Sequence, residues 1–177
     1  MNGKIPCIHT ERLCLAGITD RDVDDMIALL TNEEIKRTFM LPDFQSHEEE
    51  KRMFERFKNL SNASDRFVYG IYKNDRLIGF INEVDVHGAE IEVGYVVHPA
   101  EQNQGYATEV LRAAISALFA LGYAVVKAGA FEGNAASMRV MEKCGMHRIA
   151  YTEDIEYRGT IHCCRFYEIE ASTHTDA

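Results

Sequence analysis

The 177-residue sequence lacks both a long apolar run and an excess of basic residues. A membrane-spanning helix needs about 18 or more consecutive apolar residues, so the sequence predicts no association with a membrane. The net charge of −9 disfavours general binding to nucleic acid, because contacts with phosphates require Lys and Arg. Residues 1–6 also lack the apolar core of a signal peptide. We therefore expect a cytoplasmic protein.

Cysteine pairs of the C-x-x-C type are missing as well, and the cysteine count of five is odd. The cysteines are Cys7, Cys14, Cys144, Cys163 and Cys164. This pattern indicates neither a disulfide framework nor a zinc site, and the histidines show no ligand spacing. We expect reduced, inert thiols in a reducing compartment, with no metal and no catalytic cysteine.

The length and a composition of 46% hydrophobic and 27% charged residues are typical of one globular domain. We place this domain at residues 1–170 and expect a disordered tail at 171–177. Apolar periodicity predicts strands at 10–15, 66–72, 77–86, 90–97, 123–131, 147–156 and 161–170, and helices at 20–30, 46–60, 104–121 and 135–144. This order predicts a single α+β domain with a mixed sheet.

One junction joins an extended strand, a polar turn and the longest predicted helix. The strand ends near Pro99, and the turn contains Gln102, Asn103, Gln104 and Gly105. Such a junction directs unpaired backbone N–H groups to one spot at the positive end of a helix dipole, which favours a phosphate or pyrophosphate. The G-x-G-x-x-G and Gly-Lys-Ser/Thr motifs are both absent. An ordinary turn capped by water explains the pattern equally well.

Three side chains near this junction carry chemistry. Strand alternation places Glu92 on one face with Gly94 and Val96, where its carboxylate is a candidate base or a solvated strand residue. Glu83, Glu90 and His98 are the other candidate bases. Asn134 follows a predicted buried strand, so it is either a helix N-cap or a hydrogen-bond partner for a ligand amide. Ser137, one turn further, offers a hydroxyl at the same place.

Four segments, in this order, resemble the GNAT superfamily of acetyl-CoA-dependent N-acetyltransferases, and in particular its RimJ/RimL-like branch. They are residues 10–15, 91–99, 102–107 and 134–146, of which 102–107 matches the family pattern Q/R-x-x-G-x-G/A. The resemblance implies a mixed, mostly antiparallel sheet of about six to seven strands with helices on both faces. It also implies that two central strands splay apart and hold acetyl-CoA between them.

The resemblance assigns roles to individual residues. Backbone groups of Val96 and Val97 pair with the pantetheine arm, Asn134 bonds the pantetheine, and Ser137 lies near the sulfur. The amides that bind the pyrophosphate are those of Gln102, Asn103, Gln104, Gly105, Tyr106, Ala107 and Thr108. Met141 stands where many members carry a tyrosine that protonates the leaving thiolate. A tyrosine acid at that position is therefore excluded, and Ser137 is expected to assist.

The implied activity is direct transfer of an acetyl group from acetyl-CoA to a primary amine, on a small molecule or a protein N-terminus. Glu92 acts as the base, directly or through water, and no covalent intermediate is expected. The alternatives are a non-catalytic acyl-CoA-binding module with the same fold, and a protein-interaction domain without cofactor. We expect the acceptor pocket in the weakly patterned segments 33–60 and 151–160, with Phe39 and Phe44 as candidate lining residues. The chain is expected to be a monomer or a homodimer.

Overall fold

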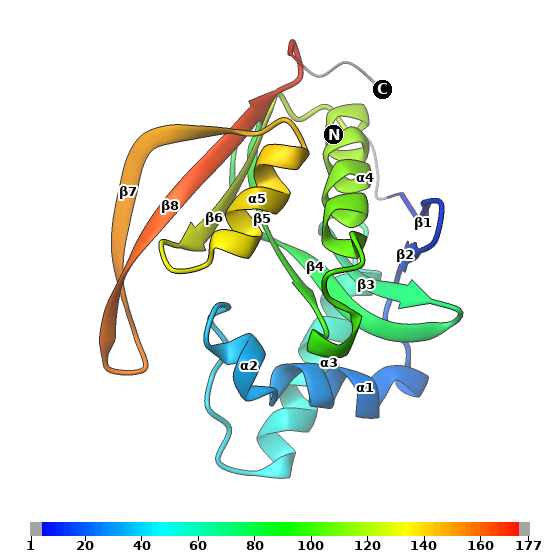
Figure 1. The fold of residues 1–177 in the computed structure, drawn as a ribbon. Helices are drawn as coiled ribbons and strands as arrows, with labels where there is room; N and C mark the ends of the chain where they lie inside the picture. Colours follow the sequence, from blue (N-terminus) through cyan, green and yellow to red (C-terminus); the bar gives the residue numbers. More distant parts are fainter. Residues whose placement is uncertain (1–4, 174–177) are drawn as a thin grey trace.

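In the computed structural model, which describes residues 5–173, the strands form one sheet in the order β1-β2-β3-β4-β5-β6-β8-β7 (Figure 1). The strands are β1 Cys7–His9, β2 Cys14–Ala16, β3 Val68–Lys73, β4 Arg76–His87, β5 Glu90–Val97, β6 Val125–Phe131, β7 His147–Tyr157 and β8 Thr160–Glu170. Within the described residues, β5 and β6 form the one parallel pair, and every other neighbouring pair is antiparallel. The mixed, mostly antiparallel α+β sheet is thus confirmed.

The sheet has eight strands, one more than the upper expected number, because β1 was not predicted and only the last two residues of the strand predicted at 10–15 belong to β2. Residues 10–13 form the turn between β1 and β2 instead of a continuous strand over 10–15. The Thr10 backbone amide donates to the Leu13 carbonyl at 2.9 Å, and the Thr10 hydroxyl accepts from the Leu13 amide at 2.9 Å. Such local side-chain bonds to the backbone compete with strand pairing and close a turn.

The five α-helices of the described chain are α1 Val23–Leu30, α2 Glu33–Lys36, α3 His47–Asn62, α4 Tyr106–Ala120 and α5 Ala135–Lys143. Short 3-10 turns at Asp20–Asp22 and Pro99–Glu101 precede α1 and α4. The predicted caps at Ser46 and Asn134 are confirmed by bonds from the amides of Glu49 and Ser137. Helix α2 was not predicted, since its four residues are too few to show a helical period.

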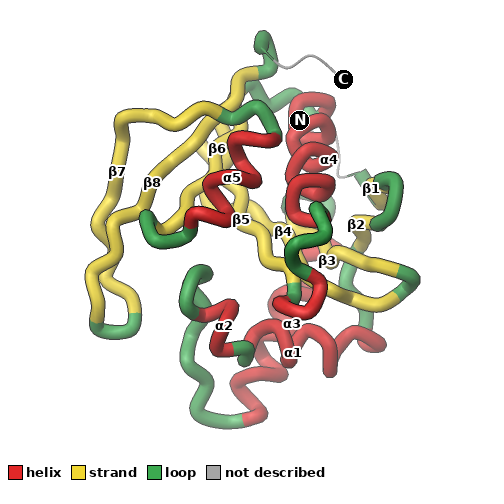
Figure 2. The backbone as a smooth tube through the Cα atoms, in the orientation of Figure 1, coloured by secondary structure: helices red, strands yellow, loops and turns green. Residues whose placement is uncertain are grey.

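Helices cover both faces of the sheet, as predicted (Figure 2). Helices α4 and α5 pack on one face through residues such as Leu111 and Met141, together with Ile91 of β5. Helices α1, α2 and α3 pack on the opposite face, where Phe80 and Val96 of the sheet meet Met26 and Phe54. No helix within residues 5–173 has the length and apolarity needed to span a membrane.

The central strands β5 and β6 separate after three residue pairs. Their pairing begins at Glu90–Val125 and ends at Glu92–Lys127. Beyond this point β6 continues to pair with β8 as far as Phe131, and β5 continues to pair with β4 as far as Val97. The two strands therefore splay apart as expected, and the opening faces the start of α4 and α5.

The β7–β8 hairpin reaches the segment between α2 and α3. The Tyr157 hydroxyl donates to the Leu41 carbonyl at 3.0 Å. Arg158 pairs with Asp43 at 3.1 Å and with Glu33 at 3.0 Å. The two segments expected to form the acceptor pocket therefore meet, although they lie more than a hundred residues apart in the sequence.

The C-terminal end of the described chain is a short turn. The Ala171 amide donates to the Ala124 carbonyl at 2.9 Å, and the Thr173 amide donates to the Glu170 carbonyl at 3.0 Å. Of the tail predicted to be disordered at 171–177, residues 174–177 lie outside the described residues.

Candidate active site

The loop before α4 presents its backbone amides to the opening between β5 and β6. Asn103 and Gly105 both have positive φ angles, of 60° and 83°, which turn the chain at this point. Within residues 5–173, the amides from Asn103 to Thr108 have no hydrogen-bond acceptor. Unpaired donors at a helix N-terminus form an anion site. The geometry that the sequence predicted for a pyrophosphate is therefore present.

The β1–β2 turn supports this loop from behind, which the sequence did not predict. Arg12 donates to the Gln104 carbonyl at 2.9 Å, and its guanidinium lies over the Tyr106 ring at 4.6 Å. It also pairs with Glu109 at 2.7 Å, and the Thr10 hydroxyl donates to the same carboxylate. The hydrogen bonds from Thr10 and Arg12 hold the pKa of Glu109 below its usual value against the effect of burial. A charged side chain of the first turn of α4 is thus fixed to the β1–β2 turn.

A cavity of about 660 Å³ occupies the opening between the two central strands. Among the predicted cofactor residues, those that line it are Val96, Val97, Gln102, Asn103, Gly105, Tyr106, Ala107, Thr108, Asn134 and Ser137. Gln104 does not line it, and its carbonyl faces Arg12 instead. Phe39 of the α2–α3 segment lines the cavity, whereas Phe44 packs beside the ammonium of Lys36 and does not.

The backbone of β5 distinguishes Val97 from Val96. The Val96 carbonyl points toward β4, where a Cβ added to Gly79 would lie 2.1 Å from it. The His98 amide donates to Ile78 of β4, and neighbouring residues of a strand direct their backbone groups to opposite edges. Val97 therefore faces the opening, and its carbonyl accepts from the Gln102 side chain at 3.0 Å. Of the two valines, Val97 has the orientation suited to a ligand in the cavity.

Asn134 and Ser137 lie at the N-terminus of α5, on the opposite wall. The Asn134 side-chain oxygen accepts from the Ser137 amide at 3.1 Å. Within residues 5–173, the side-chain nitrogen Nδ2 of Asn134 has no acceptor. The capping and ligand-binding interpretations of Asn134 are therefore compatible. Its oxygen caps the helix, and its NH₂ group remains available to a carbonyl in the cavity.

Tyr95 is a cavity residue that sequence reasoning missed. Its hydroxyl lies 2.8 Å from the Ser137 Oγ. Burial raises the pKa of Tyr95, although the Ser137 hydroxyl opposes the shift, so the phenol keeps its proton at neutral pH. The signal in the sequence was a hydroxyl-bearing side chain on the otherwise apolar face of β5, together with Ile91 and Val93.

Glu92 lines a neighbouring hollow of about 390 Å³, beside the cofactor cavity. Along β5 it lies two residues before Gly94, which lines the cavity, a separation of about 6–7 Å in an extended strand. Burial is the main cause that raises the pKa of Glu92, followed by the charges of Asp85 and Glu153, while Lys127 opposes them. A carboxylate with a raised pKa is better suited to accept a proton from an ammonium group.

The other candidate bases already have partners. Glu83 pairs with Arg66 at 2.9 Å and accepts from the Phe67 amide. Glu90 forms an ion pair with Lys127. His98 accepts from the Ala100 amide at 3.2 Å and caps the 3-10 turn. Glu92 forms no such ion pair or hydrogen bond within residues 5–173.

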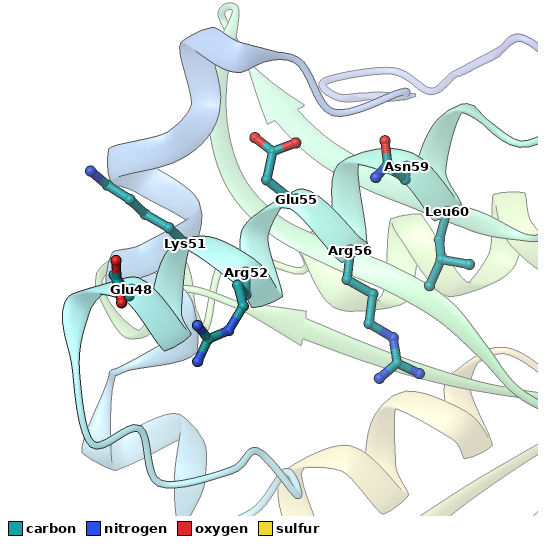
Figure 3. Close-up of a pocket in the computed structure, with 7 residues that line it drawn as sticks. All are labelled: Glu48, Lys51, Arg52, Glu55, Arg56, Asn59 and Leu60. Carbon is teal, nitrogen blue, oxygen red and sulfur yellow. The ribbon is translucent and has the colours of Figure 1, made fainter.

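Another hollow, of about 710 Å³, lies along α3 (Figure 3). It is lined by Glu48, Lys51, Arg52, Glu55, Arg56, Asn59 and Leu60, all from this one helix. These residues lie in the segment 33–60 in which the acceptor pocket was expected, but none of them is among the individual candidate site residues. Opposite charges alternate along the helix, as on many solvated helix surfaces.

Comparisons with known proteins agree with this geometry. A family model described as an acetyltransferase (GNAT) domain matches residues 12–147. The chain is 30% identical over 171 residues to the uncharacterized N-acetyltransferase YoaA of Bacillus subtilis, with 93% of this chain and 96% of that protein covered. The structure of Mycobacterium smegmatis RimJ in complex with CoA-disulfide has a TM-score of 0.86 at 15% identity, covering 100% of this chain and 93% of that one. Spermidine N-acetyltransferase from Vibrio cholerae, in complex with CoA and spermine, has a TM-score of 0.77 at 17% identity, with coverages of 91% and 96%.

The chain therefore belongs to the GNAT family of acetyltransferases. It is an acetyl-CoA-dependent N-acetyltransferase, and the presence of RimJ among its structural neighbours agrees with the predicted RimJ/RimL-like branch. Acetyl-CoA is the cosubstrate in this family, and acetyl transfer requires no metal.

Proposed function

We propose that this enzyme acetylates a small cationic amine by direct attack on acetyl-CoA. The observation that carries the proposal is the position of Glu92, whose partly buried carboxylate lies next to the opening of β5 and β6. The hollow around it is lined by three further carboxylates, those of Asp85, Glu90 and Glu153, and by two basic residues, Lys127 and His87. Such a site favours ligands with positive charge.

The cofactor would enter the cavity with its diphosphate on the amides from Asn103 to Thr108. The pantetheine would run along β5 beside Val97 and accept a hydrogen bond from Asn134. This arrangement would put the thioester between Val97, at the end of β5, and Ser137, with Glu92 five residues earlier on the same strand. The acceptor would approach from the side of α2, where Phe39 lines the cavity.

The reaction requires a neutral amine. Glu92 takes a proton from the ammonium group through intervening water molecules, and the amine lone pair forms a bond to the acetyl carbon. The Val97 amide stabilises the oxyanion, an effect commonly worth about 3 kcal/mol per donor. The carbon–sulfur bond then breaks, and the adduct nitrogen releases its second proton to water. The CoA thiolate receives a proton from Ser137, Ser137 regains one from Tyr95, and Tyr95 regains one from water. The products are the N-acetylated amine and CoA.

An acceptor screen that measures CoA release tests this function. It should contain polyamines, aminoglycosides, amino acids and peptides with free N-termini. We expect turnover with polyamines, because several positive charges match the acidic hollow. Turnover with peptides alone would contradict the small-amine proposal. If acetyl-CoA raises the melting temperature and no acceptor releases CoA, the alternative of a non-catalytic acyl-CoA-binding module is favoured.

The pH dependence of kcat/KM reports on Glu92. The Glu153 charge raises the pKa of Glu92 and the Lys127 charge lowers it. Glu92 accepts a proton only when ionised, so activity falls as pH drops through this pKa. Glu153→Gln should therefore move the acid limb of the profile to lower pH, and Lys127→Met should move it to higher pH. The ionisation of the amine is common to all variants, so the opposite shifts isolate Glu92. Identical acid limbs in all three enzymes would contradict its role.

Tyr95→Phe tests the proton path to the leaving thiolate. Removal of the hydroxyl that lies 2.8 Å from Ser137 Oγ should lower kcat by about tenfold, equivalent to one hydrogen bond of about 1.4 kcal/mol. The Kd of acetyl-CoA should change little. Tyr72→Phe is the matched control, because it removes a partly buried hydroxyl that bonds Asp22 far from the cavity. An equal loss of kcat in both variants would assign the effect to stability.

A further inference from the structure

Three metal-ligating side chains meet on the β1–β2 hairpin. In its register His9 pairs with Cys14, and Cys7 lies two residues before His9. Side chains two residues apart share a face of a strand, so Cys7, His9 and Cys14 project on the same side. The Cys7 sulfur lies 3.4 Å from His9 Nε2 and 2.7 Å from the Cys14 sulfur, and all three ligand atoms are within 4.8 Å of one another.

The donor set suits a soft cation. Two thiolates and an imidazole are ligands that Zn²⁺ prefers. With bonds of about 2.3 Å to sulfur and 2.0–2.1 Å to nitrogen, a tetrahedral ion separates a sulfur from a nitrogen by about 3.5 Å and two sulfurs by about 3.8 Å. The distance between the Cys7 sulfur and His9 Nε2 already fits. Rotation of the cysteine side chains that moves the two sulfurs about 1 Å further apart brings the sulfur–sulfur distance to the value required around the ion. A disulfide uses only the two sulfurs and leaves the third donor, His9, without a role.

We propose that the hairpin binds one zinc-class divalent cation through Cys7, His9 and Cys14, with a solvent molecule as the fourth ligand. His9 is exposed and both cysteines are partly buried, so an ion reaches the site from solvent. Acetyl transfer needs no metal, and the hairpin lies behind the cofactor loop. The ion is therefore structural, and the proposal does not depend on the identity of the acceptor.

Hydrogen bonds connect the proposed metal site to the cofactor loop. The turn between the ligands contains Thr10 and Arg12, which bond Glu109 and the carbonyl of Gln104. An ion at the base of this turn restrains the residues that support the pyrophosphate amides. We expect the loaded protein to melt at a higher temperature, because the ion binds the folded hairpin more tightly than the unfolded chain.

Titration with Co²⁺ and then Zn²⁺ tests the proposal on the reduced full-length chain without a histidine tag. We expect one equivalent of Co²⁺ to produce a thiolate-to-cobalt charge-transfer band and the intense visible bands of tetrahedral cobalt, both lost on addition of Zn²⁺. Cys14→Ser and His9→Ala should each weaken binding at least tenfold. Cys163→Ser is the matched control and should bind as the wild type does, because Cys163 belongs to no such cluster within residues 5–173.

Two results would overturn the proposal. One is the absence of the charge-transfer band, or equal affinity in the wild type and Cys14→Ser. The other is a loss of two of the five free thiols on mild treatment with peroxide, in a protein that binds no metal, when Cys14→Ser shows no such loss, since this would assign Cys7 and Cys14 to a disulfide. If Cys14→Ser does not fold, the His9→Ala variant decides, because His9 is exposed.

Discussion

Glu92→Gln should lower kcat by about 10²- to 10⁴-fold, the range typical of a lost general base, and leave the Kd of acetyl-CoA within about twofold. The amide that replaces the carboxylate cannot take the proton of the ammonium group. Binding of the cofactor should persist, because Glu92 lines the neighbouring hollow and not the cofactor cavity. Steady-state kinetics and calorimetry with acetyl-CoA measure the two quantities separately.

Glu83→Gln is the control for this experiment. Glu83 lies on the adjacent strand β4, was also a candidate base, and pairs with Arg66 and the Phe67 amide. Its replacement should cost stability and leave kcat unchanged. A large loss of kcat in Glu83→Gln, with little change in Glu92→Gln, would show that the base is misassigned.

Gly105→Val should weaken acetyl-CoA binding by roughly 10- to 100-fold. Gly105 has a φ of 83°, and a β-branched residue in that region carries strain of about 1–3 kcal/mol. The loop relieves this strain by leaving the conformation that binds the cofactor. Since about 1.4 kcal/mol corresponds to a tenfold change in affinity, the strain sets the expected range. Calorimetric titration with acetyl-CoA measures the effect.

Gly122→Val separates strain from binding. Gly122 lies just beyond the other end of α4, with a φ of 98° and no atom within 4 Å of an added Cβ. This variant carries a similar backbone strain far from the cofactor loop. It should lower the melting temperature and leave the Kd of acetyl-CoA unchanged. Equal Kd values in the two glycine variants would mean that the loop conformation does not matter for binding.

The sequence predicted the parts of the fold that depend on local patterns. The end of α5 is an example, because the helix predicted at 135–144 is followed by Gly145, which has a positive φ of 83°, and the Met146 amide donates to the Met141 carbonyl as in a Schellman motif. The strand predicted at 10–15 was wrong for residues 10–13, because apolar alternation does not reveal the bonds between Thr10 and Leu13 that close a turn. Four-residue α2 is too short to leave a periodic signal.

The candidate site was only partly predictable, for a related reason. The motif around Gly105 marks the loop, because its conformation is fixed by neighbouring residues. The hydrogen bond between Tyr95 and Ser137 joins residues 42 positions apart, and the Cys7–Cys14 contact depends on hairpin register. Tertiary packing of this kind has no signature in the spacing of residues. The same tertiary packing places Glu92 in a separate acidic hollow.

The central claim is that backbone amides at the start of α4 bind the diphosphate of CoA. A crystal structure of the protein with acetyl-CoA tests it most directly. We expect diphosphate oxygens at about 2.7–3.2 Å from amides between Asn103 and Thr108, with the thioester between Val97 and Ser137. A cofactor bound elsewhere, or a diphosphate held only by Lys and Arg side chains, would contradict it.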